Sequence, residues 1–544
     1  MRAKLARATG AARQKTIRTD SAKRSSKRTC GNVVEPLESR ELLTTYYVSP
    51  SGRDNAAGTS QNSAWKTITR VNQQNLRSGD KVLFKGNATF NGTLYLTGNE
   101  SGVTISSYGG RASIHGGNWR GIDVLDGNGT TITNINVRGN GMYANGGSGI
   151  YFHTNTAGKV MDSITVSDVA VSGFGAYDIK FEAWTGGSRY QNVRITNASI
   201  HDSLEGGIWI NGSANRVHKN IYIANVYTWN HPGNGSWNKV TGNGIALFDV
   251  DGATIENSVA HDNGANGKAP VGIWTAGSNR VTIQNCESFN NKTIANSDGG
   301  GFDFDWDVTN SVMQYNYSHD NEGPGFLVCG DNHNSDGNVI RYNISQNDGR
   351  KNGVGAILLY GNAKNLKIHN NTVYMNPTGR GDSAAFKAFH SGGTSMSNVD
   401  VRNNIFYTVG GVSVVDVDNA ITDNGSNSFL GNAYHAGGSG FNIRWSGRNF
   451  NSLDSFRGGT GKEKMNGANV GYQGDPGLKA AGRAGKVDNA RNMRSSLWHY
   501  QLNGNSPMIN RGVSLAGALA AAPTDFYGNS TARGGKYDIG ASEA

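Results

Sequence analysis

Short runs in which apolar and variable residues alternate recur through most of the chain. Examples are Gly149–Phe152 (GIYF) and Gly301–Phe304 (GFDF), each of which opens with a small residue. An alternation with a period of two is typical of β-strands that bury one face. The first apolar positions of 11 such runs lie between residues 122 and 412, at intervals of 24–37 residues. Such a period, without helical segments between the runs, predicts the coils of a parallel β-solenoid.

A second apolar–variable–apolar run follows most of these runs, as at Val193–Ile195, Ile221–Ile223 and Val281–Ile283, and it leads to a turn that contains asparagine. Asparagine tolerates left-handed backbone, and its side chain can hydrogen-bond along a stack of equivalent turns. We therefore expect asparagine ladders along the solenoid. The asparagines concerned are Asn197, Asn225, Asn257, Asn285, Asn316, Asn343, Asn371 and Asn404.

The repeat resembles the right-handed parallel β-helix of pectate lyases, polygalacturonases and related carbohydrate-active proteins, over roughly residues 100–435. Tyr500–Leu502, Ser506–Asn510 and Tyr537–Ala541 resemble the closing segment of exported β-helix proteins. The resemblance implies an all-β fold, a single-stranded right-handed parallel β-helix of about 11 or more coils with an N-terminal cap and an irregular C-terminal cap.

The repeat, the closing segment and the basic N-terminal residues together predict three regions. They are a basic targeting segment at residues 1–45, the β-helix with its N-terminal cap at 46–435, and a C-terminal capping region at 436–544 that packs on the helix. Short helices are expected at about Ile68–Gln74 and Leu453–Arg457.

The net charge of +10 is concentrated at one end, because residues 1–30 hold ten Lys and Arg residues and one Asp. The near-neutral remainder argues against a nucleic-acid partner. Val34–Leu43 resembles the LEPR-XLL motif of planctomycete proteins that are thought to be exported, which implies an extracellular or cell-surface location. An apolar run of about 18 residues is lacking, so no membrane span is expected. We expect a monomer whose partner is a glycan.

Ser297–Glu322 concentrates carboxylates, among them Asp298, Asp303, Asp305, Asp307 and Glu322. The neighbouring Phe302 and Phe304 occupy inward positions, so Asp303 and Asp305 are predicted to face outward, about 6.6 Å apart. Asp298 and Glu322 precede consecutive strands and are predicted to stack about one coil, or about 4.8 Å, apart. These four carboxylates would form one cluster, with Asp307 in the turn beyond.

Crowded carboxylates need either a proton on one of them or a bound cation. A hydrolase needs no cofactor and uses one carboxyl as an acid and another as a base, for which Asp303, Asp305 and Glu322 are candidates. A lyase would instead place Ca²⁺ on the carboxylates and use a basic side chain to abstract a proton. Candidate calcium ligands are Asp298, Asp303, Asp305 and Glu322, and candidate bases are Lys180 and Lys387.

Aromatic side chains are frequent at the predicted outward positions. An exposed aromatic face stacks well on sugar rings and marks a binding surface. The alternative is that loops cover these rings and make a small second core. The candidate substrate-binding residues are Trp209, Asn211, Phe248, Trp274, Tyr360 and Phe389.

Two classes of function remain open. The first is an exported enzyme that cleaves an extracellular polysaccharide, by hydrolysis or elimination, in an aromatic-lined groove on the outward face of the β-helix. The second is a non-catalytic β-helix that binds glycans or belongs to a cell surface. β-Helix folds serve both purposes, so the fold does not decide between them.

Overall fold

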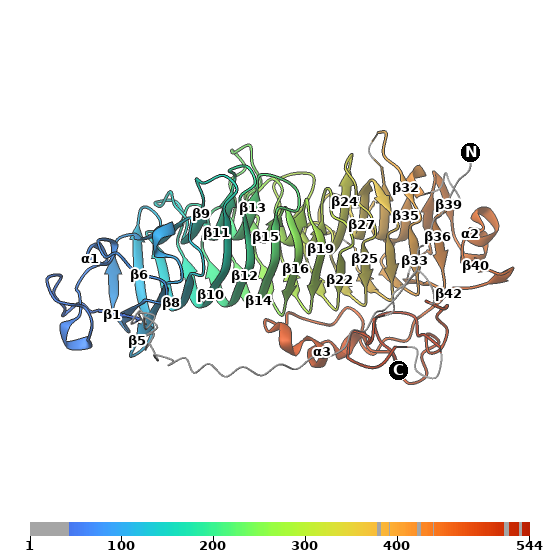
Figure 1. Cartoon of the computed structure of the whole chain (residues 1–544). Coiled ribbons are helices and arrows are strands. Elements are labelled where there is room, and N and C mark those ends of the chain that lie inside the picture. The colour runs from blue at the N-terminus through green and yellow to red at the C-terminus, as the bar shows by residue number, and fades with distance from the viewer. Residues whose placement is uncertain are drawn as a thin grey trace, which may run out of the picture. The chain divides into compact units, whose positions relative to one another are not determined.

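The computed structural model describes residues 43–377, 382–390, 392–421, 426–438, 440–515, 522–531 and 536–544. The predicted targeting segment, including the motif at Val34–Leu43, lies outside the described residues except for its last few positions. Leu43–Ala544 forms one compact unit, a parallel β-solenoid whose strands stack coil upon coil (Figure 1). Among the described residues, no helix is long and apolar enough to cross a membrane.

One sheet of the solenoid carries the outward positions on which the candidate chemistry depends. Within the described chain it has 14 strands, all paired in parallel except the last two. In chain order they are β4 (Leu94–Leu96), β7 (Ile122–Leu125), β9 (Ile150–His153), β11 (Tyr177–Ala183), β13 (Gly206–Gly212), β15 (Asn243–Phe248), β18 (Val271–Ala276), β21 (Gly300–Phe304), β24 (Phe326–Asp331), β27 (Gly355–Gly361), β31 (Ala384–Phe389), β35 (Ser413–Val417), β38 (Ile443–Trp445) and β39 (Arg448–Phe450).

The second large sheet has 24 strands in the described chain and supplies the other walls of each coil. They are β1 (Thr45–Val48), β2 (Lys81–Lys85), β3 (Thr89–Asn91), β5 (Thr104–Tyr108), β6 (Ala112–Gly117), β8 (Thr131–Gly139), β10 (Val160–Ser172), β12 (Arg189–His201), β14 (His218–Trp229), β16 (Val250–Glu256), β17 (Val259–His261), β19 (Asn279–Gln284), β20 (Glu287–Phe289), β22 (Val312–Gln314), β23 (Tyr317–His319), β25 (Val339–Arg341), β26 (Ile344–Gln346), β29 (Lys367–His369), β30 (Thr372–Met375), β33 (Asp400–Arg402), β34 (Ile405–Val409), β36 (Ser428–Leu430), β37 (Ala433–Gly437) and β42 (Tyr472–Gln473).

Minor elements complete the described fold. Two small pairs are β28 (Ala363–Lys364) with β32 (Met396–Ser397) and β40 (Lys464–Met465) with β41 (Ala468–Asn469). The α-helices are α1 (Ile68–Asn72), α2 (Leu453–Thr460) and α3 (Met493–Ser496). Both expected helices are confirmed, and their apolar side chains, such as Val71 and Phe456, are buried in the main core.

In most strands of the 14-stranded sheet a small residue precedes the first inward apolar position, and it has a steric cause. A Cβ on Gly244 would lie 2.4 Å from the carbonyl oxygen of Gly272 in the next coil. The apolar residues that follow, such as Ile245 and Leu247, are fully buried and pack on equivalent residues of adjacent coils. The repeat of the sequence is therefore the repeat of the core.

Asparagine ladders run along the solenoid, as the sequence predicts. The Asn343 side chain donates to Asn371 Oδ1 at 3.0 Å, and the Asn371 side chain donates to Asn404 Oδ1 at 2.9 Å. These side chains are almost completely buried. The ladder continues through Asn432 to Glu463, whose carboxylate accepts the last side-chain hydrogen bond at 2.8 Å.

A C-terminal segment packs along the solenoid rather than only at its end. Tyr227 donates to Asp488 at 3.2 Å, and the Asn370 amide donates to the backbone of Asp538 at 3.0 Å. Parallel pairing itself continues beyond residue 435, because Ala433 and Tyr434 pair with β42. This segment lies on the 24-stranded sheet, so it leaves the outward face of the 14-stranded sheet open to other loops.

Candidate active site

Asp298, Asp303 and Asp305 line one cavity of about 510 Å³ on the outward side of the 14-stranded sheet. The predicted direction of Asp303 is confirmed. Its neighbours Phe302 and Phe304 belong to the main core, while Asp303 pairs with Trp274 of β18 and Leu327 of β24 on the outer side. The alternation of the strand therefore points the carboxylate into the cavity.

The preceding loop brings Asp298 to the same cavity. Asp298 and Gly299 both have left-handed backbone, with φ of 60° and 76°. Gly299 donates its N–H to Pro270 O at 2.7 Å, which ties the loop to the neighbouring coil. Ser297 Oγ donates to Asp298 Oδ2 at 3.0 Å. This sharp turn directs Asp298 over the start of β21.

The cavity makes the three carboxyl groups hard to ionise. Burial raises the pKa of Asp298 to about 6. Burial, together with the nearby Asp298 carboxylate, raises the pKa of Asp305 to about 7, although the Trp306 N–H donates to it at 2.8 Å. Asp303 is only 1% exposed, and burial raises its pKa well above the usual range. At neutral pH the cavity therefore holds at least one protonated carboxyl group.

Hydrogen bonds restrain the side chain of Asp305 more than that of Asp303. Cys329 of β24 lines the same cavity, and burial beside Asp305, Asp303 and Asp298 raises the pKa of its thiol. Asp303 Oδ1, by contrast, has no hydrogen-bond partner among the described residues. No lysine or arginine lines the cavity in the part of the chain that the structure describes.

Aromatic and aliphatic side chains form the walls of the cavity. The predicted residues Trp274, Tyr360 and Phe389 line it. The other apolar wall residues are Val240, Ala269, Val271, Trp306, Pro324, Leu327, Val354 and Leu358. Acidic groups thus sit on the floor of a largely apolar cavity, an arrangement that is typical of ligand sites.

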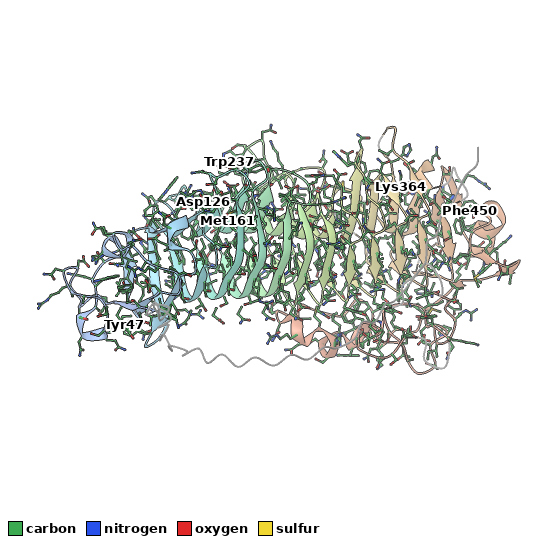
Figure 2. The ribbon with its side chains drawn as sticks, in the orientation of Figure 1. Tyr47, Asp126, Met161, Trp237, Lys364 and Phe450 are labelled. Carbon is green, nitrogen blue, oxygen red and sulfur yellow. The ribbon has the colours of Figure 1, made fainter. Side chains whose placement is uncertain are left out.

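Two further aromatic residues that the sequence singled out lie beside the cavity and do not line it. Phe248 is 6% exposed and packs between Trp209 and Trp274, with ring centroids 4.4 and 4.8 Å away. Trp209 and Trp306 cover this cluster, and Val240 reaches it from the loop after β14. The same loop carries Trp237, which Figure 2 labels. For Phe248 the prediction of an exposed sugar-binding ring is wrong. The alternative, that loops cover the ring and make a small second core, is correct there.

Glu322 does not join the cluster, and the predicted set of four carboxylates is corrected on this point. Its backbone lies where expected, since the next residue, Gly323, donates to Gly299 O at 2.9 Å. Its side chain instead accepts from the Thr293 N–H at 2.9 Å and lies 3.5 Å from Lys351 Nζ. Among the described residues, no three His, Cys, Asp or Glu side chains are arranged to hold a metal ion. The predicted calcium ligand set of four carboxylates is therefore not assembled, because Glu322 is engaged elsewhere.

The two candidate bases are held away from the cavity by ion pairs. Lys180 Nζ lies 2.9 Å from Glu182 on its own strand, β11. Lys387 Nζ lies 3.2 Å from Asp416 and donates to the Gly353 and Asp382 carbonyls. Asn211 pairs in register with Glu182 and does not line the cavity. Neither lysine lines the cavity that the aspartates share.

Sequence reasoning missed several lining residues from loops and strand ends. They are Asn296, Ser297, Trp306, Cys329, Asp331 and His333, besides the apolar residues of the loops. Trp306 directly follows Asp305, and its position inside the acidic stretch is the signal in the sequence that could have predicted it. His333 lies beyond β24 and is held 3.5 Å from Asp307, a contact that no repeat pattern reveals.

The coils define a parallel β-helix architecture, and comparisons with known proteins agree with this fold. A family model described as "Right handed beta helix region" matches residues 191–406. The chain is 25% identical over 503 residues to the lacto-N-biosidase of Bifidobacterium longum subsp. longum. That match covers 72% of this chain and spans 30% of the length of the relative.

Solved structures also resemble this chain. The GH136 lacto-N-biosidase of Eubacterium ramulus is 18% identical with a TM-score of 0.50, covering 66% of this chain and 67% of that one. Pectate lyase Pel9A is 16% identical with a TM-score of 0.36, covering 92% of this chain and 96% of that one. The family model and the Eubacterium structure assign the solenoid to the right-handed parallel β-helix architecture.

Proposed function

We propose that this protein is a glycoside hydrolase that cleaves a glycan in the cavity, with Asp298 and Asp305 as the acid and base pair. The observation that carries the proposal is the convergence of carboxyl groups with raised pKa values on an aromatic-walled cavity. Glycosidases work with two such carboxyl groups, one of them protonated, on either side of the scissile bond.

The choice of Asp298 and Asp305 rests on exposure. Both are partly exposed to the cavity, whereas Asp303 is 1% exposed and its high pKa keeps it protonated. A buried neutral carboxyl group cannot serve as a base, but its proton can hydrogen-bond a neighbouring carboxylate. Asp303 is therefore assigned the supporting role, and the pair that touches substrate is Asp298 and Asp305.

Hydrolysis is favoured over elimination. Elimination from a uronate needs a base and a positive group near the sugar carboxylate. Lys180 and Lys387 are engaged elsewhere, and the described lining supplies neither lysine nor arginine. An acidic cavity also repels an anionic sugar, so the substrate is expected to be neutral.

The aromatic rings in the cavity wall can stack on the apolar faces of sugar rings. Trp274, Trp306, Tyr360 and Phe389 are the candidate stacking residues. The name of the Bifidobacterium relative, a lacto-N-biosidase, makes a lacto-N-bioside the first substrate to test.

The test is product analysis with purified protein. We expect p-nitrophenyl β-lacto-N-bioside, or another neutral oligosaccharide of a panel, to yield a new reducing end without an unsaturated product. Asp305→Asn should lose this activity, while the control Asp168→Asn, at a position of left-handed backbone in β10 of the other sheet, should keep it. Cleavage that yields unsaturated ends, or binding without cleavage, would overturn the proposal.

Export is proposed on the sequence alone. The basic residues 1–30 and the motif at Val34–Leu43 support it. Fractionation of the source cells tests it, since an exported protein is found at the cell surface or in the medium and an intracellular one is not.

A further inference from the structure

A second cluster of ionisable side chains lies on the same outward face, toward the N-terminal end of the sheet. It consists of Arg120, Asp123, Tyr151, His153, Lys180 and Glu182, which we call the polar platform. Asp123 pairs with Tyr151 and Tyr151 with Lys180, on three consecutive coils. Lys180 is separated from Asp303 by four coils, or about 19 Å. The platform is therefore distinct from the cavity.

Close contacts fix the side chains of the polar platform. His153 Nε2 lies 2.7 Å from Asp123 Oδ1, and Arg120 donates to Asp123 Oδ2 at 2.6 Å. Tyr151 donates to Glu182 at 2.6 Å, and its ring stacks on that of His153 at 4.6 Å. The groups thus hold one another in place and need no further reorganisation to meet a ligand, which favours binding.

The polar platform is still accessible. The side chains of Arg120, His153 and Lys180 are 24%, 19% and 18% exposed. All three side chains are therefore in contact with solvent. Asp126, which Figure 2 labels, follows β7 at the same end of the sheet.

Three exposed aromatic rings surround the polar platform. Tyr95 is 46% exposed and pairs with Asp123 from the preceding coil. Trp119 is 48% exposed, and the Arg120 guanidinium lies between its ring and that of Tyr151. Trp184 is 58% exposed and lies two residues beyond Glu182. Within the described chain only two other aromatic side chains, Tyr143 and Trp498, are among the exposed large hydrophobic residues.

The charges of the polar platform are balanced. Although burial disfavours the charge, the hydrogen bonds from His153 and Arg120 lower the pKa of Asp123. Lys180 and Tyr151 likewise lower the pKa of Glu182 against the effect of burial. Two carboxylates therefore face two permanent cations, and the surface has no net charge that would select an ionic ligand.

We propose that the polar platform and its rim of Tyr95, Trp119 and Trp184 form a second, non-catalytic binding site for a neutral oligosaccharide. Polar groups of fixed geometry can hydrogen-bond sugar hydroxyls, and exposed indole rings stack on the apolar faces of pyranoses. The site does not depend on the cavity being catalytic, because none of its residues lines that cavity.

Isothermal titration calorimetry tests the proposal on full-length Asp305→Asn protein, which does not consume the sugar. The probes are lacto-N-biose, triacetylchitotriose and cellotetraose, with tetragalacturonate as the charged comparison. Trp119→Ala/Trp184→Ala should weaken binding of a neutral probe at least tenfold or remove one of two sites. Trp498→Ala, at an exposed tryptophan elsewhere, is the matched control and should change nothing.

Each outcome either supports or overturns the second binding site. Binding that falls in the double variant and in Tyr95→Ala, but not in Trp498→Ala, supports the site. Neutral probes that fail to bind, tetragalacturonate as the sole ligand, or unchanged binding in the double variant would overturn it. Hydrolysis of a short aryl glycoside by the double variant with Asp305 intact should stay at the wild-type rate, so failure of the second site leaves the proposed hydrolase unaffected.

Discussion

Lys351 Nζ lies 3.5 Å from Glu322 Oε2, and this pair keeps Glu322 apart from Asp298, Asp303 and Asp305 of the cavity. We therefore expect Glu322→Gln to keep at least half of the wild-type kcat/KM on a cleaved glycoside. The Thr293 N–H retains an acceptor in the glutamine amide oxygen, so the loop keeps its position. A loss comparable to that of Asp305→Asn would show that Glu322 takes part in the reaction.

Asp303→Asn tests whether the Asp303 carboxyl group supports the catalytic pair or takes part in the reaction itself. A buried Asp with a raised pKa must take up a proton on folding, so its folded state loses stability as pH rises above the unfolded pKa of about 3.9. Asparagine removes this penalty. We expect a variant more stable than wild type by up to about 4 kcal/mol at pH 7, with little difference near pH 4.

Chemical denaturation at these two pH values measures the effect on the free energy of unfolding. The activity of Asp303→Asn should fall far less than that of Asp298→Asn or Asp305→Asn. If the difference in stability between Asp303→Asn and wild type were the same at both pH values, the pKa of Asp303 would not be raised in the folded protein, and its supporting role as a proton donor would be wrong.

The pH profile of kcat/KM should be bell-shaped. The acid must be protonated and its partner ionised, and burial raises the pKa of Asp298 to about 6 and that of Asp305 to about 7. Activity is therefore expected to decline below about pH 6 and above about pH 7, with the limbs belonging to the coupled pair. A rate that stays constant well into the alkaline range would contradict protonation of a cavity aspartate as a requirement.

Asn371→Ala tests the asparagine ladder. Asn371 Oδ1 accepts from both the backbone and the side chain of Asn343, and Asn371 Nδ2 donates to Ile340 O and Asn404 Oδ1. Each buried polar group left without a partner costs about 1–3 kcal/mol, so a loss of about 3 kcal/mol or more is expected. Asn505→Ala, at an exposed position, is the control and should lie within about 0.5 kcal/mol of wild type.

The fold could be predicted because every coil repeats the same local rules. The alternation around Phe302 gave the direction of Asp303, and the stacked asparagines gave their own ladder. Strand periodicity carries no information about side chains that loops place between coils. It therefore missed Trp306 and His333, and it put Glu322 beside Asp298, although the Glu322 side chain turns toward Lys351.

Burial was the other quantity that sequence alone could not supply. Outward positions were expected to be accessible, yet loops cover Phe248 and Asp303 to 6% and 1% exposure. That covering changes the chemistry, since it raises the pKa of Asp303 and shifts the candidate pair from Asp303 and Asp305 to Asp298 and Asp305. The loops differ from coil to coil, so the repeat could not reveal them.

The most direct measurement compares Asp298→Asn and Asp305→Asn on two aryl glycosides that differ only in the leaving group. Removing the general acid should slow release of a poor leaving group by about 10²–10⁴ and affect a highly activated one far less, while removing its partner should slow both. If Asp298 and Asp305 are the acid and base pair, the two variants fall one into each class, and Asp168→Asn is unchanged. Full activity of either cavity variant on both glycosides would contradict the assignment.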